Sequence, residues 1–208
     1  MSVKLPVGIC LVLFLFLLQL WAEAFTVVMP ESPVNEKEIV LRLKEGGYII
    51  YMRHGATVHS QSDRTDSDFE NCALQRNLSK EGKDTAQAVA AAFKQEHIPV
   101  GKVLSSPYCR CKDTARLAFG HFAIDRNLRF ALISDINETI ALKEHLRDLL
   151  LSEPDTGTNT VLVSHTANLK EAAGIWPKPE AVMIVFRRLG KNRLGYIGKI
   201  EPGFWSSR

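Results

Sequence analysis

The fold of this chain can be inferred outward from one stretch, Tyr48-Ile49-Ile50-Tyr51-Met52-Arg53-His54-Gly55-Ala56-Thr57. Its first five residues form an apolar run rich in aromatic and β-branched side chains, too short for a helix, which predicts a buried strand. In open α/β sheets, ligands bind just past the carboxyl ends of such strands. Arg53 and His54 are therefore candidate site residues, although a strand that merely ends in polar residues would show the same pattern.

The rest of the chain alternates helical and strand patterns. Helices are predicted at 36–44, 79–96, 110–119, 137–151 and 167–174, strands at 103–105, 128–133 and 160–164, and a terminal hairpin at 181–186 and 194–200. This alternation predicts an α/β fold, namely a three-layer α/β/α sandwich with a mostly parallel sheet and an antiparallel C-terminal edge. We expect one domain over 36–208.

The N-terminus has the pattern of a secretory signal. Lys4 precedes an apolar run from Leu5 to Trp21, and Ala22-Glu23-Ala24 supplies small residues for cleavage after Ala24. We therefore predict a signal peptide at 1–24 and a linker at 25–35. The alternative is an uncleaved anchor. The domain is expected to be periplasmic or secreted, with no stable membrane span after cleavage.

The cysteine count predicts a disulfide, and the net charge limits the kinds of partner that the protein can bind. Three cysteines remain beyond the signal, Cys72, Cys109 and Cys111, which predicts one disulfide and one buried thiol. The two cysteines of Cys109-Arg110-Cys111 are too close in sequence to favour a disulfide between them, so a disulfide between Cys72 and Cys109 is preferred. We expect no zinc site, because the cysteines lack CxxC spacing. The net charge is only +3 and no Lys/Arg block is present, which argues against a nucleic-acid partner.

Basic and imidazole side chains stand at the ends of three predicted strands. Arg53 and His54 follow the first strand, Arg110 lies in the helix after the second, and His165 follows 160–164. Parallel strands place their carboxyl ends along one edge, so these four residues can converge. Buried like charges are costly unless an anion joins them, and arginine forks match phosphoryl oxygens. The polar segment 59–77 reads as a long loop beside this edge, where functional residues are common.

Four motifs resemble those of the histidine phosphatase superfamily, which has the phosphoglycerate-mutase-like fold. They are Arg53-His54-Gly55, Ser105-Ser106-Pro107 with Arg110-Cys111-Lys112-Asp113-Thr114-Ala115, Val163-Ser164-His165, and Asn77-Leu78-Ser79-Lys80-Glu81-Gly82. The resemblance covers about 48–174 in the family's order. Among small exported members, the chain is similar in plan to the lipopolysaccharide core heptose phosphatases.

The resemblance implies a role for each residue. His54 would be the nucleophile that forms a phosphohistidine, and Arg53, Arg110 and His165 would hold the phosphoryl oxygens. Thr57 would add a hydroxyl contact. Neighbouring guanidinium groups would keep His54 neutral, and no metal or cofactor is expected.

The general acid is the weakest part of the resemblance. Asp135 is the preferred candidate and Glu138 the second, because both fall in the family's window after the helix arginine. Either residue would serve equally well as a turn residue or a helix cap.

The expected function is that of an exported phosphomonoesterase acting on a small phosphorylated substrate, with a phosphosugar as one candidate. The alternative is a non-catalytic module of the same fold that binds phosphate.

Overall fold

The computed structural model describes residues 24–64, 68–131 and 135–206. Residues 1–23 of the predicted signal peptide lie outside this part of the chain. Within it, no helix combines the length and hydropathy needed to cross a bilayer.

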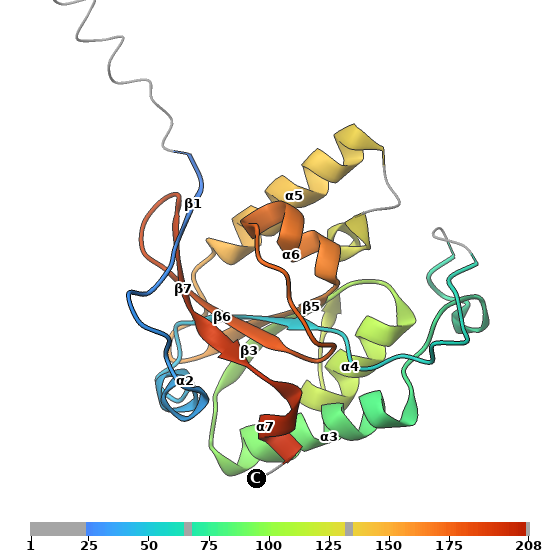
Figure 1. Ribbon diagram of the computed structural model, residues 1–208, viewed down its shortest axis with the longest axis horizontal. Coiled ribbons are helices and arrows are strands. Elements are labelled where there is room, and N and C mark those ends of the chain that lie inside the picture. The colour runs from blue at the N-terminus through green and yellow to red at the C-terminus, as the bar shows by residue number, and fades with distance from the viewer. Residues whose placement is uncertain (1–23, 65–67, 132–134, 207–208) are drawn as a thin grey trace, which may run out of the picture.

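A seven-stranded sheet forms the centre of the described structure, in the order β1-β7-β6-β2-β5-β3-β4 (Figure 1). The strands are β1 (Thr26–Val28), β2 (Ile49–Arg53), β3 (Val100–Ser105), β4 (Ala123–Ile124), β5 (Asn159–Ser164), β6 (Met183–Arg188) and β7 (Arg193–Ile200). Strand β2 pairs in parallel with β5, which pairs in parallel with β3. Strand β6 runs antiparallel to both of its neighbours, β2 and β7. The predicted α/β fold with an antiparallel C-terminal hairpin is confirmed.

Helices cover both faces of the sheet and make it the middle of three layers (Figure 1). One face packs against α2 (Glu36–Leu43), α3 (Lys80–Gln95), α4 (Cys109–Phe119) and α7 (Pro202–Ser206), and the other against α5 (Ile136–Leu150) and α6 (Thr166–Ala173). Successive side chains of a strand point to opposite faces. Accordingly, Ile50 and Met52 enter the first core, whereas Ile49 and Tyr51 enter the second. Strand β2 is thus buried on both sides, as its apolar run predicts.

Two segments differ from the sequence predictions. The predicted linker at 25–35 contains β1, which pairs in parallel with β7 and packs Val27 against the core. The predicted strand at 128–133 does not form in its described part, because Arg126–Leu128 is a 3-10 turn capped by the Asp125 side chain. The edge strand is instead β4, a few residues earlier.

The turn after β2 rests directly on the N-terminus of α3. Ser79 caps this helix by accepting a hydrogen bond from the Gly82 N–H at 3.1 Å, and its own N–H donates to the Ala56 carbonyl at 2.9 Å. A Cβ built on Gly82 would overlap the backbone of Ala56. The absence of a side chain at this position allows the helix to support the His54 turn.

Replacing Gly82 by Ala tests this close approach. Glycine to alanine in a helix normally stabilises. At Gly82 we expect a loss of roughly 1–3 kcal/mol, because the added methyl group meets backbone that cannot give way. The matched control is Gly203→Ala in α7, where an added Cβ meets nothing within 4 Å. Urea unfolding measures both variants, and equal stability of the two would contradict the packing described here.

Candidate active site

The structure brings His54, His165, Arg53 and Arg110 together at the carboxyl edge of the parallel strands. His54 follows β2, His165 follows β5, and Arg110 lies in the first turn of α4, which follows β3. The ring centroids of the two histidines are 5.5 Å apart, and Arg110 Nη2 is 3.4 Å from His165 Nδ1. A cavity of about 260 Å³ is lined by Arg53, His54, Asp63, Arg76, Arg110, Phe130, His165, Thr166, Ala167, Trp176 and Lys178.

The surroundings of His54 leave one ring nitrogen available for attack. Its Nδ1 is 2.9 Å from the Gly55 carbonyl oxygen, which only accepts hydrogen bonds, so Nδ1 carries the proton. Nε2 therefore keeps its lone pair. Burial, and next the charge of Arg110, hold the pKa of His54 well below its ordinary value of 6.5. A neutral imidazole of this tautomer is a nucleophile at neutral pH.

His165 is fixed from several sides. Arg110 only donates hydrogen bonds, so His165 Nδ1 accepts, and Nε2 then donates to Ser106 Oγ at 2.8 Å. Tyr51 Oη donates to the His165 carbonyl at 2.6 Å. Burial, and then Arg110, also lower the pKa of His165 well below 6.5. The second imidazole is thus neutral and held in place.

Two carboxylates that the sequence analysis missed hold the arginines. Asp63 accepts from Arg110 Nη1 at 2.9 and 3.1 Å, and Glu180 lies 3.3 Å from Arg53 Nη2. The Nε atoms of both arginines are buried and have no hydrogen-bond partner among the described residues. Since buried donors are normally satisfied, these two N–H groups are suited to the oxygens of an anion.

The structure keeps Thr57 close to the site but outside the cavity lining. Its hydroxyl donates to Glu180 Oε1 at 3.1 Å, so it acts on Arg53 through that carboxylate. Arg76, by contrast, lines the cavity. Its backbone N–H donates to Asp63 Oδ1 at 2.9 Å.

The structure does not bring the predicted acid, Asp135, into the site. Asp135 Oδ1 accepts from the N–H groups of Asn137 and Glu138 at 2.8 and 3.0 Å and caps α5. Glu138 accepts from Arg129 Nε at 2.9 Å. Neither carboxylate is among the residues that line the cavity. The first N–H groups of a helix need acceptors, and Asp135 meets that need here, so the cap interpretation replaces that of the acid.

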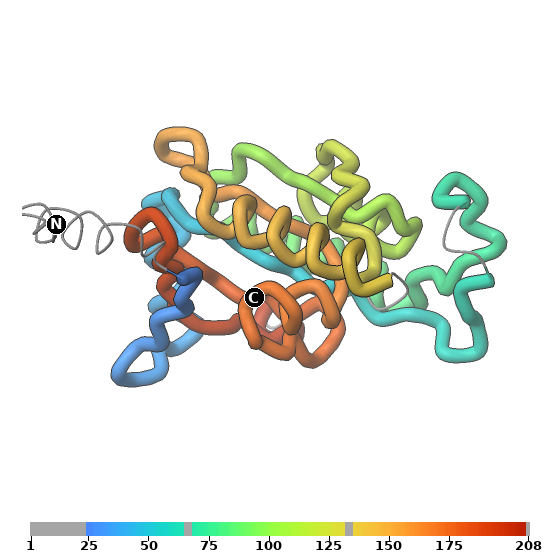
Figure 2. The backbone as a smooth tube through the Cα atoms, turned by 90° about the horizontal axis from the view of Figure 1, so that it is seen from above, coloured from blue at the N-terminus to red at the C-terminus, as the bar shows by residue number. Residues whose placement is uncertain are grey.

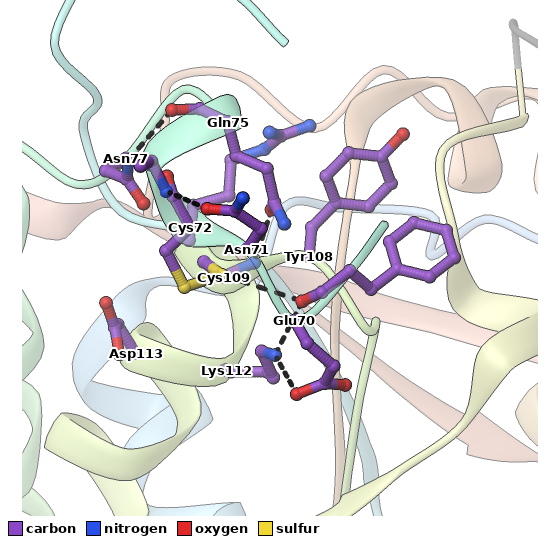
Figure 3. Close-up of a disulfide and its surroundings, with 12 residues drawn as sticks. Glu70, Asn71, Cys72, Gln75, Asn77, Tyr108, Cys109, Lys112 and Asp113 are labelled. Carbon is purple, nitrogen blue, oxygen red and sulfur yellow. Dashed lines mark hydrogen bonds and ion pairs between the residues drawn. A yellow bond between two sulfur atoms is a disulfide. The ribbon is translucent and has the colours of Figure 1, made fainter. Parts of the chain in front are cut away.

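A disulfide ties the loop between β2 and α3 to helix α4. Cys72 and Cys109 are bonded, as predicted, and Cys111 is a buried free thiol whose pKa burial raises to about 12. Around the disulfide, Lys112 Nζ donates to the Phe69 carbonyl at 2.9 Å (Figure 3). The loop, drawn in teal, projects from one end of the molecule (Figure 2). The part of the chain described holds no group of three or more His, Cys, Asp or Glu that could bind a metal.

Comparisons with known proteins agree with this geometry. The model of the histidine phosphatase superfamily (branch 1) matches residues 49–138, a range that contains Arg53, His54 and Arg110. Over this range, the chain is similar to the histidine phosphatase superfamily. No curated protein sequence matches it.

Several solved structures share the fold. The alpha-ribazole phosphatase from Shigella flexneri has a TM-score of 0.56 at 13% identity, covering 74% of this chain and 96% of its own. A phosphoserine phosphatase mutant from Entamoeba histolytica, in complex with phosphoserine, has a TM-score of 0.53 at 16% identity, and the match covers 76% of this chain and 98% of the other. The protein histidine phosphatase SixA, complexed with tungstate, has a TM-score of 0.52 at 16% identity, and the match covers 75% of this chain and 97% of the other. At these identities, the likeness is one of fold.

Removing the disulfide by the double substitution Cys72→Ser and Cys109→Ser should cost about 2–5 kcal/mol of stability. Without the bond, the segment between Cys72 and Cys109, a separation of 37 residues, is no longer closed into a ring in the unfolded chain, which gains entropy. The control is Cys111→Ala, which keeps the disulfide and should lose less. Thermal unfolding with and without dithiothreitol is the measurement. A double variant as stable as the wild type, or one that still responds to dithiothreitol, would contradict the assignment.

The two depressed histidine pKa values predict a loss of stability in mild acid. Below about pH 6.5 the unfolded chain binds protons at both positions while the folded chain does not, so stability is full above that pH and falls below it. The slope is at most about 1.4 kcal/mol per pH unit for each histidine. Urea unfolding from pH 7.5 to 5.0 should show a shallower slope for His54→Asn than for the wild type. The exposed His59→Gln is the control, and parallel curves for all three proteins would refute the prediction.

Proposed function

We propose that the protein is an exported phosphomonoesterase that works without a metal, through a phosphohistidine on His54. One observation carries the proposal. Two neutral imidazoles, the buried guanidinium group of Arg110 and the partly buried one of Arg53 surround one cavity, and each arginine keeps a buried Nε donor with no partner among the described residues. A phosphoryl group is the size and charge that such donors match.

The first step transfers the phosphoryl group to the enzyme. The Nε2 lone pair of His54 attacks phosphorus, the P–O bond to the alcohol breaks, and the departing oxygen takes up a proton. The Gly55 carbonyl holds the Nδ1 proton and stabilises the positive charge that the ring acquires. Arg53 and Arg110 face the phosphoryl oxygens, on which negative charge is concentrated in the transition state.

The second step returns the enzyme to its starting state. Water attacks the phosphohistidine, the P–N bond breaks, and phosphate leaves with His54 neutral again. The proton released by water balances the one taken up by the alcohol. Asp63 positions Arg110 in both steps, because its oxygens already accept hydrogen bonds from Arg110 and from the Arg76 backbone.

Export and the sugar substrate are the finer parts of this proposal. A leader-like N-terminus and the Cys72–Cys109 disulfide support export, because structural disulfides persist in oxidising compartments. An envelope phosphosugar is the candidate substrate by similarity in plan to the lipopolysaccharide core heptose phosphatases.

Hydrolysis of p-nitrophenyl phosphate tests the activity. We expect His54→Ala to lower kcat/KM by at least about a thousandfold and Arg110→Ala by about a hundredfold. The control is His59→Ala, which replaces an exposed histidine in the loop after β2 and should leave kcat/KM unchanged. Acid quenching with labelled substrate should trap phosphate on His54 in the wild type and not in His54→Ala. A wild-type protein that binds inorganic phosphate without turnover would support the non-catalytic phosphate-binding module instead.

A further inference from the structure

Trp176 and Lys178 are among the cavity residues that have no part in the phosphoryl chemistry described above. Trp176 and Lys178 lie on the segment 175–182, which connects α6 to β6, and both line the cavity. His54, Arg110 and His165 are at most 2% exposed, whereas Trp176 is 50% exposed. The phosphoryl site is therefore the closed end of the cavity, and Trp176 and Lys178 stand at its open end.

The segment 175–182 is anchored to the strand that carries the nucleophile. The Pro177 carbonyl accepts from Arg53 Nη1 at 3.4 Å, and the Ala181 N–H donates to the His54 carbonyl at 2.9 Å. These contacts bracket Lys178 and immediately follow Trp176. Both side chains are thus held at a fixed place relative to the phosphoryl site, where the alcohol part of a substrate must lie.

The two side chains form one composite surface. Lys178 Nζ is 5.1 Å from the centre of the Trp176 indole ring, within the range of a cation–π contact. Exposing an indole to water is unfavourable, and Trp176 is the aromatic member of the large apolar side chains found exposed in the described chain. The negative face of an indole attracts the C–H groups of a sugar ring, because those hydrogens carry partial positive charge.

The charged side chains of the cavity also fall into two groups, one at its closed phosphoryl end and one at its open end. Arg53 and Arg110 have carboxylate partners, and Arg76 contributes to lowering the pKa of both histidines, so all three belong to the phosphoryl end. Lys178 forms no ion pair with a carboxylate within the described residues. Its ammonium group is therefore placed to bind an anion that is not the transferred phosphoryl group.

We propose that Trp176 and Lys178 form the subsite for the leaving group, and that this subsite selects phosphorylated sugars carrying a second anionic group. The proposal rests on the proposed phosphatase function and deepens it. Trp176 stacks on the sugar ring, and Lys178 binds the second anion beside it.

Three phosphate esters separate these contributions in steady-state kinetics. They are glycerol 2-phosphate, glucose 6-phosphate and glucose 1,6-bisphosphate, which add first a ring and then a second anion. We expect the wild-type kcat/KM to rise in that order. Trp176→Leu should lower kcat/KM three- to tenfold for both sugars and leave glycerol 2-phosphate unchanged, whereas Trp176→Phe should keep most of it. Lys178→Gln should lower kcat/KM about tenfold for the bisphosphate alone. Lys191→Gln, at an exposed lysine of the β6–β7 turn, is the matched control.

Binding measurements keep this test separate from that of the proposed function. Calorimetric titration of His54→Ala, alone and combined with each substitution, reads the subsite without turnover. If the wild type hydrolyses none of the esters, the proposed function fails, and the same order of affinities in the His54→Ala background would still support the subsite. Equal effects of Lys178→Gln on all three esters, or sugar preference retained by Trp176→Leu, would overturn it.

Discussion

The site depends on the balance of charge around two arginines, the buried Arg110 and the partly buried Arg53. Guanidinium groups beside two buried imidazoles repel any further positive charge, and desolvation adds to that cost. Asp63 offsets the charge of Arg110 and Glu180 that of Arg53. Each carboxylate engages Nη atoms, and the Nε atoms of both arginines have no hydrogen-bond partner among the described residues. The carboxylates thus offset the charge of the two arginines and leave their Nε donors without a protein acceptor among the described residues, which is what the proposed phosphoryl site requires.

In this arrangement, the strand ends and the turn after β3 position the histidines and Arg110, whereas two of the connecting loops supply the carboxylates. Strands β2 and β5 place His54 and His165, and the turn after β3 places Arg110. The two stabilising carboxylates come from connections, Asp63 from the loop before α3 and Glu180 from the segment before β6. Chemistry at the strand ends is therefore completed by loops that are themselves bound to the strands.

The parts predicted from the sequence are those with strong local patterns. The apolar run before Arg53 fixes a buried strand, and the right order of strands and helices then fixes a parallel sheet whose carboxyl ends meet. This logic brought His54, Arg110 and His165 together although they are distant along the chain. Counting cysteines predicted one disulfide, and excluding the pair that is too close in sequence left Cys72 with either Cys109 or Cys111; the preferred partner, Cys109, is the one observed.

The remaining parts lack such patterns. Asp63 and Glu180 lie in segments without periodicity, where one acidic residue looks like any other until the backbone brings it to an arginine. Asp135 shows the opposite problem, because an acidic residue before a helix suits a cap as well as a catalytic acid. In its described part, 128–131, the strand predicted at 128–133 does not form, because the Asp125 cap starts a 3-10 turn that runs into its first residue.

The disulfide has a topological consequence for the Asp63–Arg110 ion pair. Along the backbone these residues are 47 positions apart. Asp63 lies shortly before Cys72, and Arg110 directly follows Cys109, so the path through the disulfide is only about ten residues long. The shorter path lowers the entropic free-energy cost of bringing the two residues together by roughly 1 kcal/mol. Because of the disulfide, the Asp63–Arg110 ion pair joins distant parts of the chain at nearly the entropic cost of a local contact.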